Sequence, residues 1–431
     1  MGSSRFFGIV LVTLIVSAAW FVLGASVQER TESLDRSLSG EMRSLWGPPS
    51  LIQPTPYVVA DPGGRDDPLD RAAPAASAIT ADIRHDHRNK GLLWYSTFTV
   101  DFTGRYTLAP AEGGVFVFPL PRGVTSYNNL AVSLDGNAVG VRQADVVAGA
   151  LRVPLPGGAA GVVEVRYCAG GQDRWLYVPG DVRSTAEGDR GDAPVVQGRL
   201  SELSDFTLTV TTDFAGIDYP KGSRSPTAPA AHVDGGRTAS WVYRHAVTSQ
   251  PMGIEMPRRV NAGPIAARMS FFAPVSLAFF FTALFTVVVL KRIDLHPMHY
   301  LFIAAGFFAF HILMAYLADV VAIHASFWIA AAVSVALVAS YMRLVAGMRF
   351  TLGYVCLAQL AYLVGFSYAF FWVGRTGLTV TLGAIATLFV LMQATGRLNW
   401  HEVFGRPHRA AAPIPAAVAA APDGQPLDPP L

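Results

Sequence analysis

Long apolar runs occur at the start of the chain and again near its end, and a polar region of about 240 residues separates them. A bilayer core of about 30 Å needs roughly 20 apolar residues of helix. The pattern therefore predicts six membrane-spanning helices, one N-terminal and five C-terminal. These runs cover residues 6–25, 270–290, 298–319, 322–342, 350–372 and 376–395.

The first run is predicted to be an uncleaved anchor. A signal peptide would end in a small-x-small site, but the position two before Ala25 is Leu23. The helical pattern also continues beyond the run, since Leu34, Leu38 and Met42 are spaced to share one helix face. We therefore expect the anchor to continue into a helical stalk.

The polar region has the alternation of β-strands. In residues 206–211 the apolar side chains Phe206, Leu208 and Val210 alternate with threonines, as in a half-buried antiparallel strand. Glycine-rich turns separate such stretches at the spacing of a β-sandwich, which predicts about nine to eleven strands. The predicted fold class is a membrane protein of α+β type, with a large extracytoplasmic antiparallel β-sandwich.

The domain organisation follows from these patterns. We predict an anchor at 1–26, a helical stalk with a Trp-Gly/Pro segment at 27–59, a flexible loop at 60–90, the β-sandwich at 91–268, a five-helix bundle at 269–400, and a disordered tail at 401–431.

Orientation is predicted from lysine and arginine in the short loops, which favour the cytoplasmic side. Arg258, Arg259 and Arg268 lie before the second span and oppose a cytoplasmic N-terminus, but the other loops outweigh them. We therefore expect both termini in the cytoplasm and the large domain outside. The residues that favour this orientation are Arg5, Lys291, Arg292, Arg343, Arg349, Arg397, Arg406 and Arg409.

Composition supports a membrane protein, because 52% of residues are hydrophobic and only 15% are charged. Soluble domains carry charge on about a quarter of their residues. The net charge of +2, with no basic stretch interleaved with aromatics, gives no reason to expect a nucleic-acid partner. Cys168 lies in the polar region and Cys356 in an apolar run, so no disulfide is expected.

Signatures of catalysis are missing from the sequence. We find no GxSxG elbow, GxxxxGK[ST] loop, GxGxxG turn or HExxH helix, so we predict neither an enzyme nor a bound cofactor. His85 and His87 flank Asp86, and histidines that alternate on a strand share a face and can bind zinc. No third ligand is in view, so we interpret them as solvated loop residues and predict no metal site.

Four polar residues in the apolar runs are candidates for function or packing: His311, Gln359 and Gln393, with Asp319 at a span end. Such residues usually face a bundle interior. His311 and Asp319 are eight residues apart and share a helix face. We favour a packing role, in which His311 bonds a neighbouring helix. The alternative is a proton or ligand path through the bundle.

Two segments resemble the CreD family of bacterial inner-membrane proteins. One is E…LWGPPSLIQPTPYV after the first span, and the other is HPMHYLF at the opening of the third. The approach to the second span lacks the family's Pro-Val-Asp segment, and the strands of the outer domain do not align with it. The residues that carry the resemblance are Glu41, Trp46, Gly47, Pro56, Tyr57, His296, Pro297 and Tyr300.

The resemblance implies an inner-membrane protein that supports cell-envelope integrity or stress tolerance, with no established enzymatic activity. The expected partners are the lipid bilayer and an envelope protein or cell-wall component that binds the periplasmic domain. The alternative function is a transporter or lipid-handling protein that uses the polar residues of the bundle.

Overall fold

A computed structural model describes the chain from residue 3 to residue 396, with internal gaps, and the predicted tail lies outside the described residues. The described ranges are 3–60, 71–91, 93–110, 114–141, 146–147, 149–156, 161–180, 182–184, 196–233, 235–259, 261–372 and 374–396. The chain forms two compact units: residues 1–24, 268–314 and 324–431 form one, and residues 25–267 and 315–323 form the other. We call them the bundle unit and the β unit.

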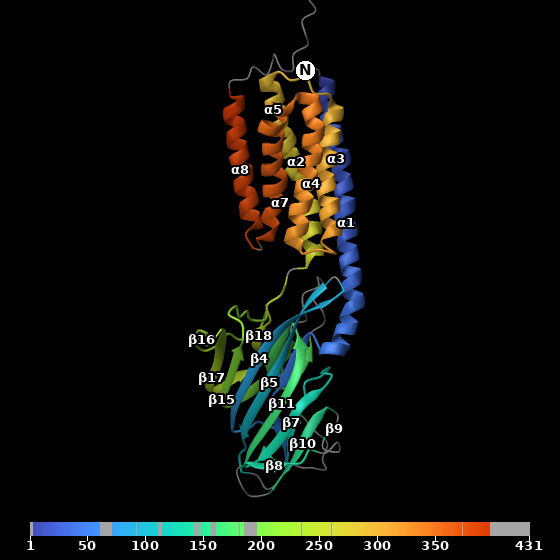
Figure 1. The fold of residues 1–431 in the computed structure, drawn as a ribbon. Coiled ribbons are helices and arrows are strands. Elements are labelled where there is room, and N and C mark those ends of the chain that lie inside the picture. Colours follow the sequence, from blue (N-terminus) through green and yellow to red (C-terminus); the bar gives the residue numbers. More distant parts are fainter. Residues whose placement is uncertain are drawn as a thin grey trace, which may run out of the picture. The chain divides into compact units, whose positions relative to one another are not determined.

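Among the described residues, six helices are long and apolar enough to cross a membrane, which confirms the predicted number and arrangement of spans. The first, α1, runs from Ser3 to Trp46 without a break. Its 44 residues extend about 66 Å at 1.5 Å per residue, roughly twice a bilayer core. The other single-helix spans are α2 (Ala262–Lys291), α3 (Pro297–Leu317), α4 (Ile323–Ala346) and α8 (Thr376–Thr395), seen side by side in Figure 1.

The fifth span, Met348–Phe371, is irregular. It contains two π-helical segments, η2 (Thr351–Cys356) and η3 (Leu360–Gly365), each six residues long. The short α6 (Leu357–Gln359) separates them. The remaining pieces of this span are α5 (Met348–Phe350), α7 (Phe366–Tyr368) and η4 (Ala369–Phe371).

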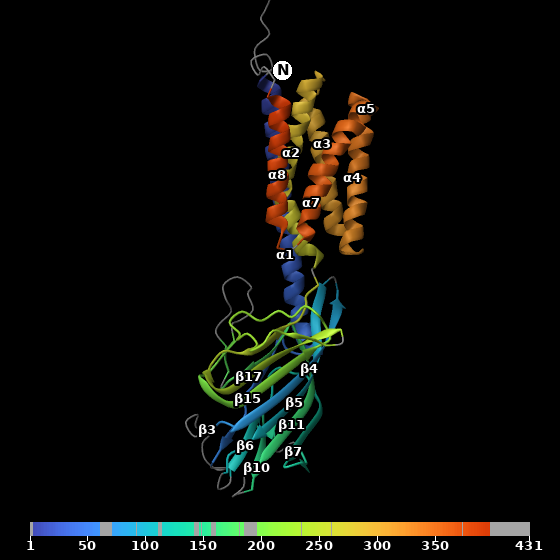
Figure 2. The same cartoon turned by 90° about the vertical axis from the view of Figure 1, so that its left-hand side faces the viewer.

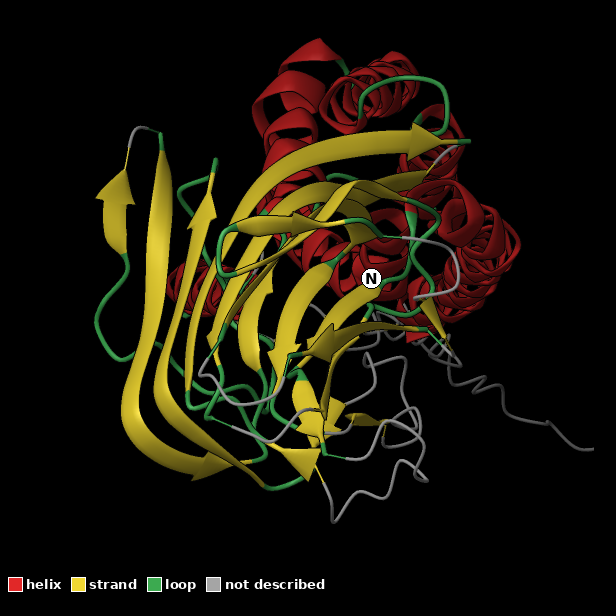
Figure 3. Cartoon of the chain, turned by 90° about the horizontal axis from the view of Figure 1, so that it is seen from below, coloured by secondary structure: helices red, strands yellow, loops and turns green. Residues whose placement is uncertain are grey.

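The β unit contains a strongly curved eight-stranded sheet (Figure 3). Its strands, in spatial order, are β16 (Ala231–Val233), β17 (Gly236–Thr248), β15 (Ser201–Thr212), β4 (Ala76–Lys90), β5 (Leu93–Thr107), β11 (Val162–Gln172), β7 (Tyr127–Leu134) and β8 (Asn137–Val139).

The described residues of this unit also form three smaller sheets, and Figure 2 labels β3, β6 and β10 of the largest of them. The five-stranded sheet has the order β3 (Arg71–Ala72), β2 (Tyr57–Val59), β6 (Gly114–Pro119), β10 (Ala150–Leu155) and β9 (Val146–Val147). The three-stranded sheet is β1 (Ser50–Pro54), β12 (Arg174–Val178) and β18 (Met252–Glu255). The smallest sheet is the antiparallel pair of β13 (Val182–Ser184) and β14 (Val196–Gly198).

The predicted alternation in β15 is confirmed. Phe206, Leu208 and Val210 are at most 1% exposed, and they belong to one large core with Trp175 and Trp241. This core contains residues of the three larger sheets, so the apolar face of each sheet is covered by the others.

Three details of the predicted β domain are wrong. The described residues form 18 strands instead of nine to eleven. Most neighbouring strands are antiparallel, but β15 pairs with β4 in parallel, and β1 pairs with β12 in parallel. Residues 76–90 were predicted as part of a flexible loop but form β4, paired with β5 along its whole length. Residues 61–70 of that loop lie outside the described residues.

Candidate functional site

A chain of hydrogen bonds crosses the bundle unit at Gln359, which is fully buried on α6. The Gln359 Nε2 donates to Ser334 Oγ on α4 at 3.0 Å, and Ser334 Oγ donates to the Gly306 carbonyl on α3 at 2.7 Å. Three spans are therefore connected through polar groups in a segment where lipid offers no partner. The Gln359 Oε1 has no hydrogen-bond partner among the described residues.

Close approach of two helices makes this chain possible. A Cβ placed on Gly306 would overlap Cγ2 of Val338, one turn beyond Ser334 on α4. Glycine therefore lets α3 and α4 come near enough for the Ser334 hydroxyl to reach a backbone carbonyl. Small residues have this use in membrane bundles, where packing replaces the hydrophobic effect as the force between helices.

The two π-helical segments flank Gln359 directly. Such segments use i→i+5 hydrogen bonds and are frequent at functional sites. In η3 the Tyr362 carbonyl also accepts a hydrogen bond from Ser276 Oγ on α2. The ring of Tyr362 stacks on Phe279 at 6.4 Å between centroids. The irregular span is therefore attached to α2 on one side and to α4 on the other.

His311 occupies a different part of the bundle unit. It is 2% exposed, and its Nδ1 lies 3.0 Å from the Phe307 carbonyl one turn earlier. Because a carbonyl only accepts, Nδ1 carries the proton and Nε2 has the lone pair. The ring packs edge-on against Trp20 of α1 at 5.5 Å and Phe310 at 4.9 Å. The predicted hydrogen bond from His311 to another helix is not formed among the described residues, and the ring instead packs on α1.

Asp319 and Gln393 have other surroundings. In the β unit, Asp319 Oδ2 pairs with Arg30 Nη2 at 2.8 Å. The same guanidinium donates to the Ala315 carbonyl and lies over the Tyr316 ring. Gln393 is exposed on α8, a helix with little burial in the described structure. The four candidates found in the sequence thus have four separate sets of neighbours.

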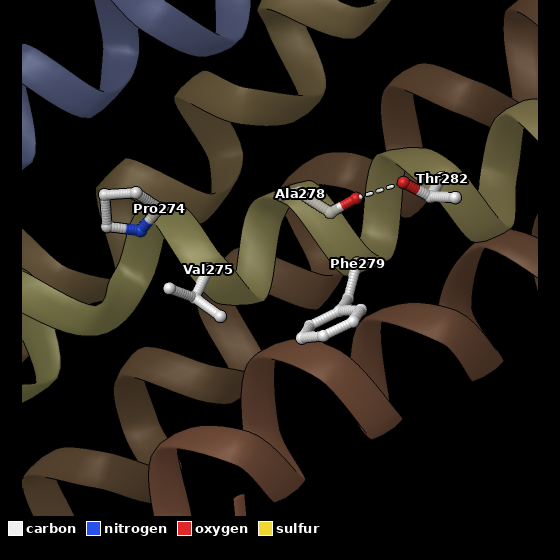
Figure 4. A pocket seen from close by; sticks show the side chains of 5 residues that line it. All are labelled: Pro274, Val275, Ala278, Phe279 and Thr282. Atoms are coloured by element: carbon white, nitrogen blue, oxygen red, sulfur yellow. Dashed lines mark hydrogen bonds between the residues drawn. The ribbon is translucent and has the colours of Figure 1, made fainter. Parts of the chain in front are cut away.

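An open apolar groove of about 360 Å³ runs along α2. Its lining comes from Pro274, Val275, Ala278, Phe279 and Thr282 (Figure 4). The Thr282 hydroxyl donates its proton to the Ala278 carbonyl of the same helix. The groove presents hydrocarbon to its surroundings, as expected for a lipid-facing helix.

The N-terminal motif attaches the end of α1 to strands β4 and β11. Glu41 Oε1 pairs with Lys90 Nζ at 2.9 Å, and the guanidinium of Arg88 lies 3.8 Å above the Trp46 ring. Both partners belong to β4, the strand that the sequence did not predict. Gly47 follows α1 with φ +97°, and a Cβ at this position would overlap the Gly170 carbonyl oxygen.

The rest of this motif enters the β core. Gln53 is fully buried in β1, where its Nε2 donates to the Pro119 carbonyl and its Oε1 accepts from Tyr167. Pro56 is buried, and the Tyr57 ring receives the Arg71 guanidinium at 4.3 Å. The motif therefore consists of residues that connect α1 to the sheets.

The second motif begins α3. Pro297 is its first residue, a position where the missing N–H removes no helical hydrogen bond. His296 Nδ1 accepts from the Met298 backbone N–H at 3.2 Å and so caps the helix. Tyr300 is fully buried and packs edge-on against Phe281. These residues fix where the third span starts.

The two histidines of HDH lie on strand β4 and not in a loop, which corrects our interpretation. Their rings are 4.2 Å apart, on the same face as the core residues Ile79 and Ile83. His85 Nε2 and His87 Nδ1 are buried and have no hydrogen-bond partner among the described residues. Burial lowers the pKa of both rings, so both are neutral near pH 7. Within the described ranges, no group of three or more His, Cys, Asp or Glu is arranged to hold a metal ion.

Comparison with protein families gives a match to one model. The model described as inner membrane protein CreD matches residues 234–401, which contain the five C-terminal spans. The resemblance to the CreD family is confirmed. This CreD-like chain combines six helices that are long and apolar enough to cross a membrane with a large β domain, both among the described residues. The motif around Trp46 lies outside the matched residues, so its family assignment stays a prediction.

The other comparisons add little. No curated protein matches the chain. Among solved structures, one similar chain comes from Legionella pneumophila and is provisionally described as a nutrient binding protein. It has 12% sequence identity and a TM-score of 0.27, and the alignment covers 53% of this chain and 75% of that one.

Sequence reasoning found Gln359 but missed its partners. Gln359 is conspicuous because an amide in an apolar run is rare. Ser334 and Ser276 gave no signal, since a serine in a helix can bond its own preceding carbonyl and needs no partner on another helix. Gly306 lies in a stretch rich in phenylalanine and alanine, and only the neighbouring Val338 shows why glycine is required there.

Proposed function

We propose that this CreD-like protein is a non-enzymatic membrane anchor for an extracytoplasmic β domain, which binds an envelope partner and supports envelope integrity. The observation that carries the proposal is α1. One continuous helix begins in the first span and ends at Trp46, where Glu41, Trp46 and Gly47 bind it to β4 and β11. A membrane span is thus covalently continuous with a stalk attached to the sheets.

The polar groups in the spans support a packing role. Gln359, Ser334 and Ser276 bond other spans, and His311 bonds its own helix. The alternative, transport or lipid handling, is favoured by one observation, the unpartnered Oε1 of Gln359 beside two π-helical segments.

Complementation of a deletion strain under detergent, osmotic or β-lactam stress distinguishes these functions. We expect His311→Leu and Gln359→Leu to rescue like wild type, because leucine fills a similar volume and no buried donor is left unsatisfied: Ser334 Oγ still donates to the Gly306 carbonyl. A chain whose residues 50–255 are replaced by a flexible linker should fail, although fractionation shows it in the membrane. Stable insertion of the Leu variants without rescue would instead favour transport.

Orientation is part of the proposal, with both termini cytoplasmic and the β domain outside. In a chain with Cys168→Ser and Cys356→Ala, we introduce Asn137→Cys or Met348→Cys, both at exposed positions. A membrane-impermeant maleimide applied to spheroplasts should label the first variant at once and the second only after lysis. The reverse order of labelling would contradict this orientation.

A further inference from the structure

The neighbouring imidazoles of His85 and His87 are unusual for a strand end, because each has a buried ring nitrogen without a hydrogen-bond partner among the described residues. An unsatisfied buried polar group costs free energy, and in a native protein it often marks the place of a bound water, an ion or a functional group. The two rings pack edge-on, with their centroids 4.2 Å apart and an interplanar angle of 86°, so the two buried nitrogens belong to one pair of touching imidazoles.

The strand supplies the spacing for this pair. Residues i and i+2 of a β-strand project from the same face, about 6.6–6.8 Å apart along the strand. Beside the histidines, Asp213 accepts hydrogen bonds from the His85 backbone N–H at 3.0 and 3.2 Å, which holds this part of β4 against the end of β15. The Phe214 ring packs edge-on against His85 at 5.7 Å.

The Pro257 backbone lies beside the His85 ring. His85 Nε2 has no hydrogen-bond partner among the described residues, so in the tautomer with the proton on Nδ1 its lone pair is free to bind a metal ion.

We propose that His85 Nε2 and His87 Nδ1 form a two-histidine site for a borderline divalent transition metal such as Zn²⁺, with water completing the coordination. Neutral imidazole is a preferred ligand for zinc, copper and nickel. Asp213 and Asp86 lie close enough to favour a cation electrostatically, and Arg259 opposes it. Open positions on the metal distinguish this site from a closed structural zinc site.

Zinc titration of the full-length, untagged protein, stripped with a chelator and held in nanodiscs, tests the proposal. We expect one saturable Zn²⁺ per chain by calorimetry. His85→Ala and His87→Ala should each weaken it at least tenfold, since each removes one of two protein ligands. His245→Ala is the matched control, because His245 is exposed on β17 and faces Glu202 in the same sheet.

A variant could lose zinc binding because it no longer folds. Melting curves of the variants and of wild type without metal distinguish this from loss of the site itself. His87→Asn keeps a polar side chain of similar size, and we expect it to melt like wild type without zinc and still to lose the binding. The proposal is overturned if wild type shows no saturable binding. It is also overturned if the His85→Ala/His87→Ala double variant binds Zn²⁺ with wild-type affinity, because other histidines would then hold the metal.

Discussion

Replacing Gly306 by valine is expected to separate α3 from α4 and to lower the stability of the bundle by about 1–3 kcal/mol, the usual cost of overpacking a core. The added side chain would occupy the space of Val338 Cγ2, and the Ser334 hydroxyl would lose the Gly306 carbonyl. Thermal unfolding of the purified protein in nanodiscs measures this loss of stability as a lower melting temperature.

Two variants show whether the effect comes from this contact. Val338→Ala in the Gly306→Val background removes the methyl groups that collide and should restore part of the lost stability. Gly383→Ala on α8 is the control, because a Cβ there meets nothing within 4 Å. Equal destabilisation by Gly383→Ala would show that any helix glycine matters and that the contact with α4 does not.

Gly47→Val is expected to detach the end of α1 from strands β4 and β11. The φ of +97° costs an L-residue about 1–2 kcal/mol, and the new Cβ would also overlap the Gly170 carbonyl oxygen. The Gln172 amide that donates to the Gly47 carbonyl at 2.7 Å would lose its acceptor if this backbone moved. We expect a loss of about 3 kcal/mol, seen as a lower melting temperature and faster proteolysis after Trp46.

Gly136→Ala separates the cost of the positive φ from the cost of the close contact with Gly170. Gly136 has φ +81°, and a Cβ there meets nothing within 4 Å, so this variant has the backbone cost alone. It should be destabilised less than Gly47→Val and should not be cleaved at the end of α1. If the two variants behaved alike, the close contact with Gly170 would have no part in holding the stalk.

The membrane part of the fold was predictable because a span needs only length and apolarity, which are read directly from the sequence. The number and placement of the spans were therefore correct. The π-helical segments of the fifth span were not foreseen, because no residue pattern distinguishes TLGYVC or LAYLVG from ordinary apolar helix.

The error at β4 has a physical cause. Its inward positions after Ile79 and Ile83 are taken by His85 and His87, and the strand follows the glycine- and aspartate-rich residues 61–67. The alternation of apolar and polar residues that reveals β15 therefore fades toward the end of β4. Strand pairing with β5 and β15 overrides this weak local preference, and pairing is not visible in one sequence.

The parallel pairing of β4 with β15 determines when the large sheet can form. Ser77 is paired with Phe206, and in the smaller sheet Ser50 is paired with Arg174. During synthesis β4 emerges long before β15, and until then one edge of β4 has unpaired amides and carbonyls. Pairings this distant in sequence form slowly. We therefore expect the β unit to fold after synthesis of its last strands, with a period in which an exposed strand edge needs protection from aggregation.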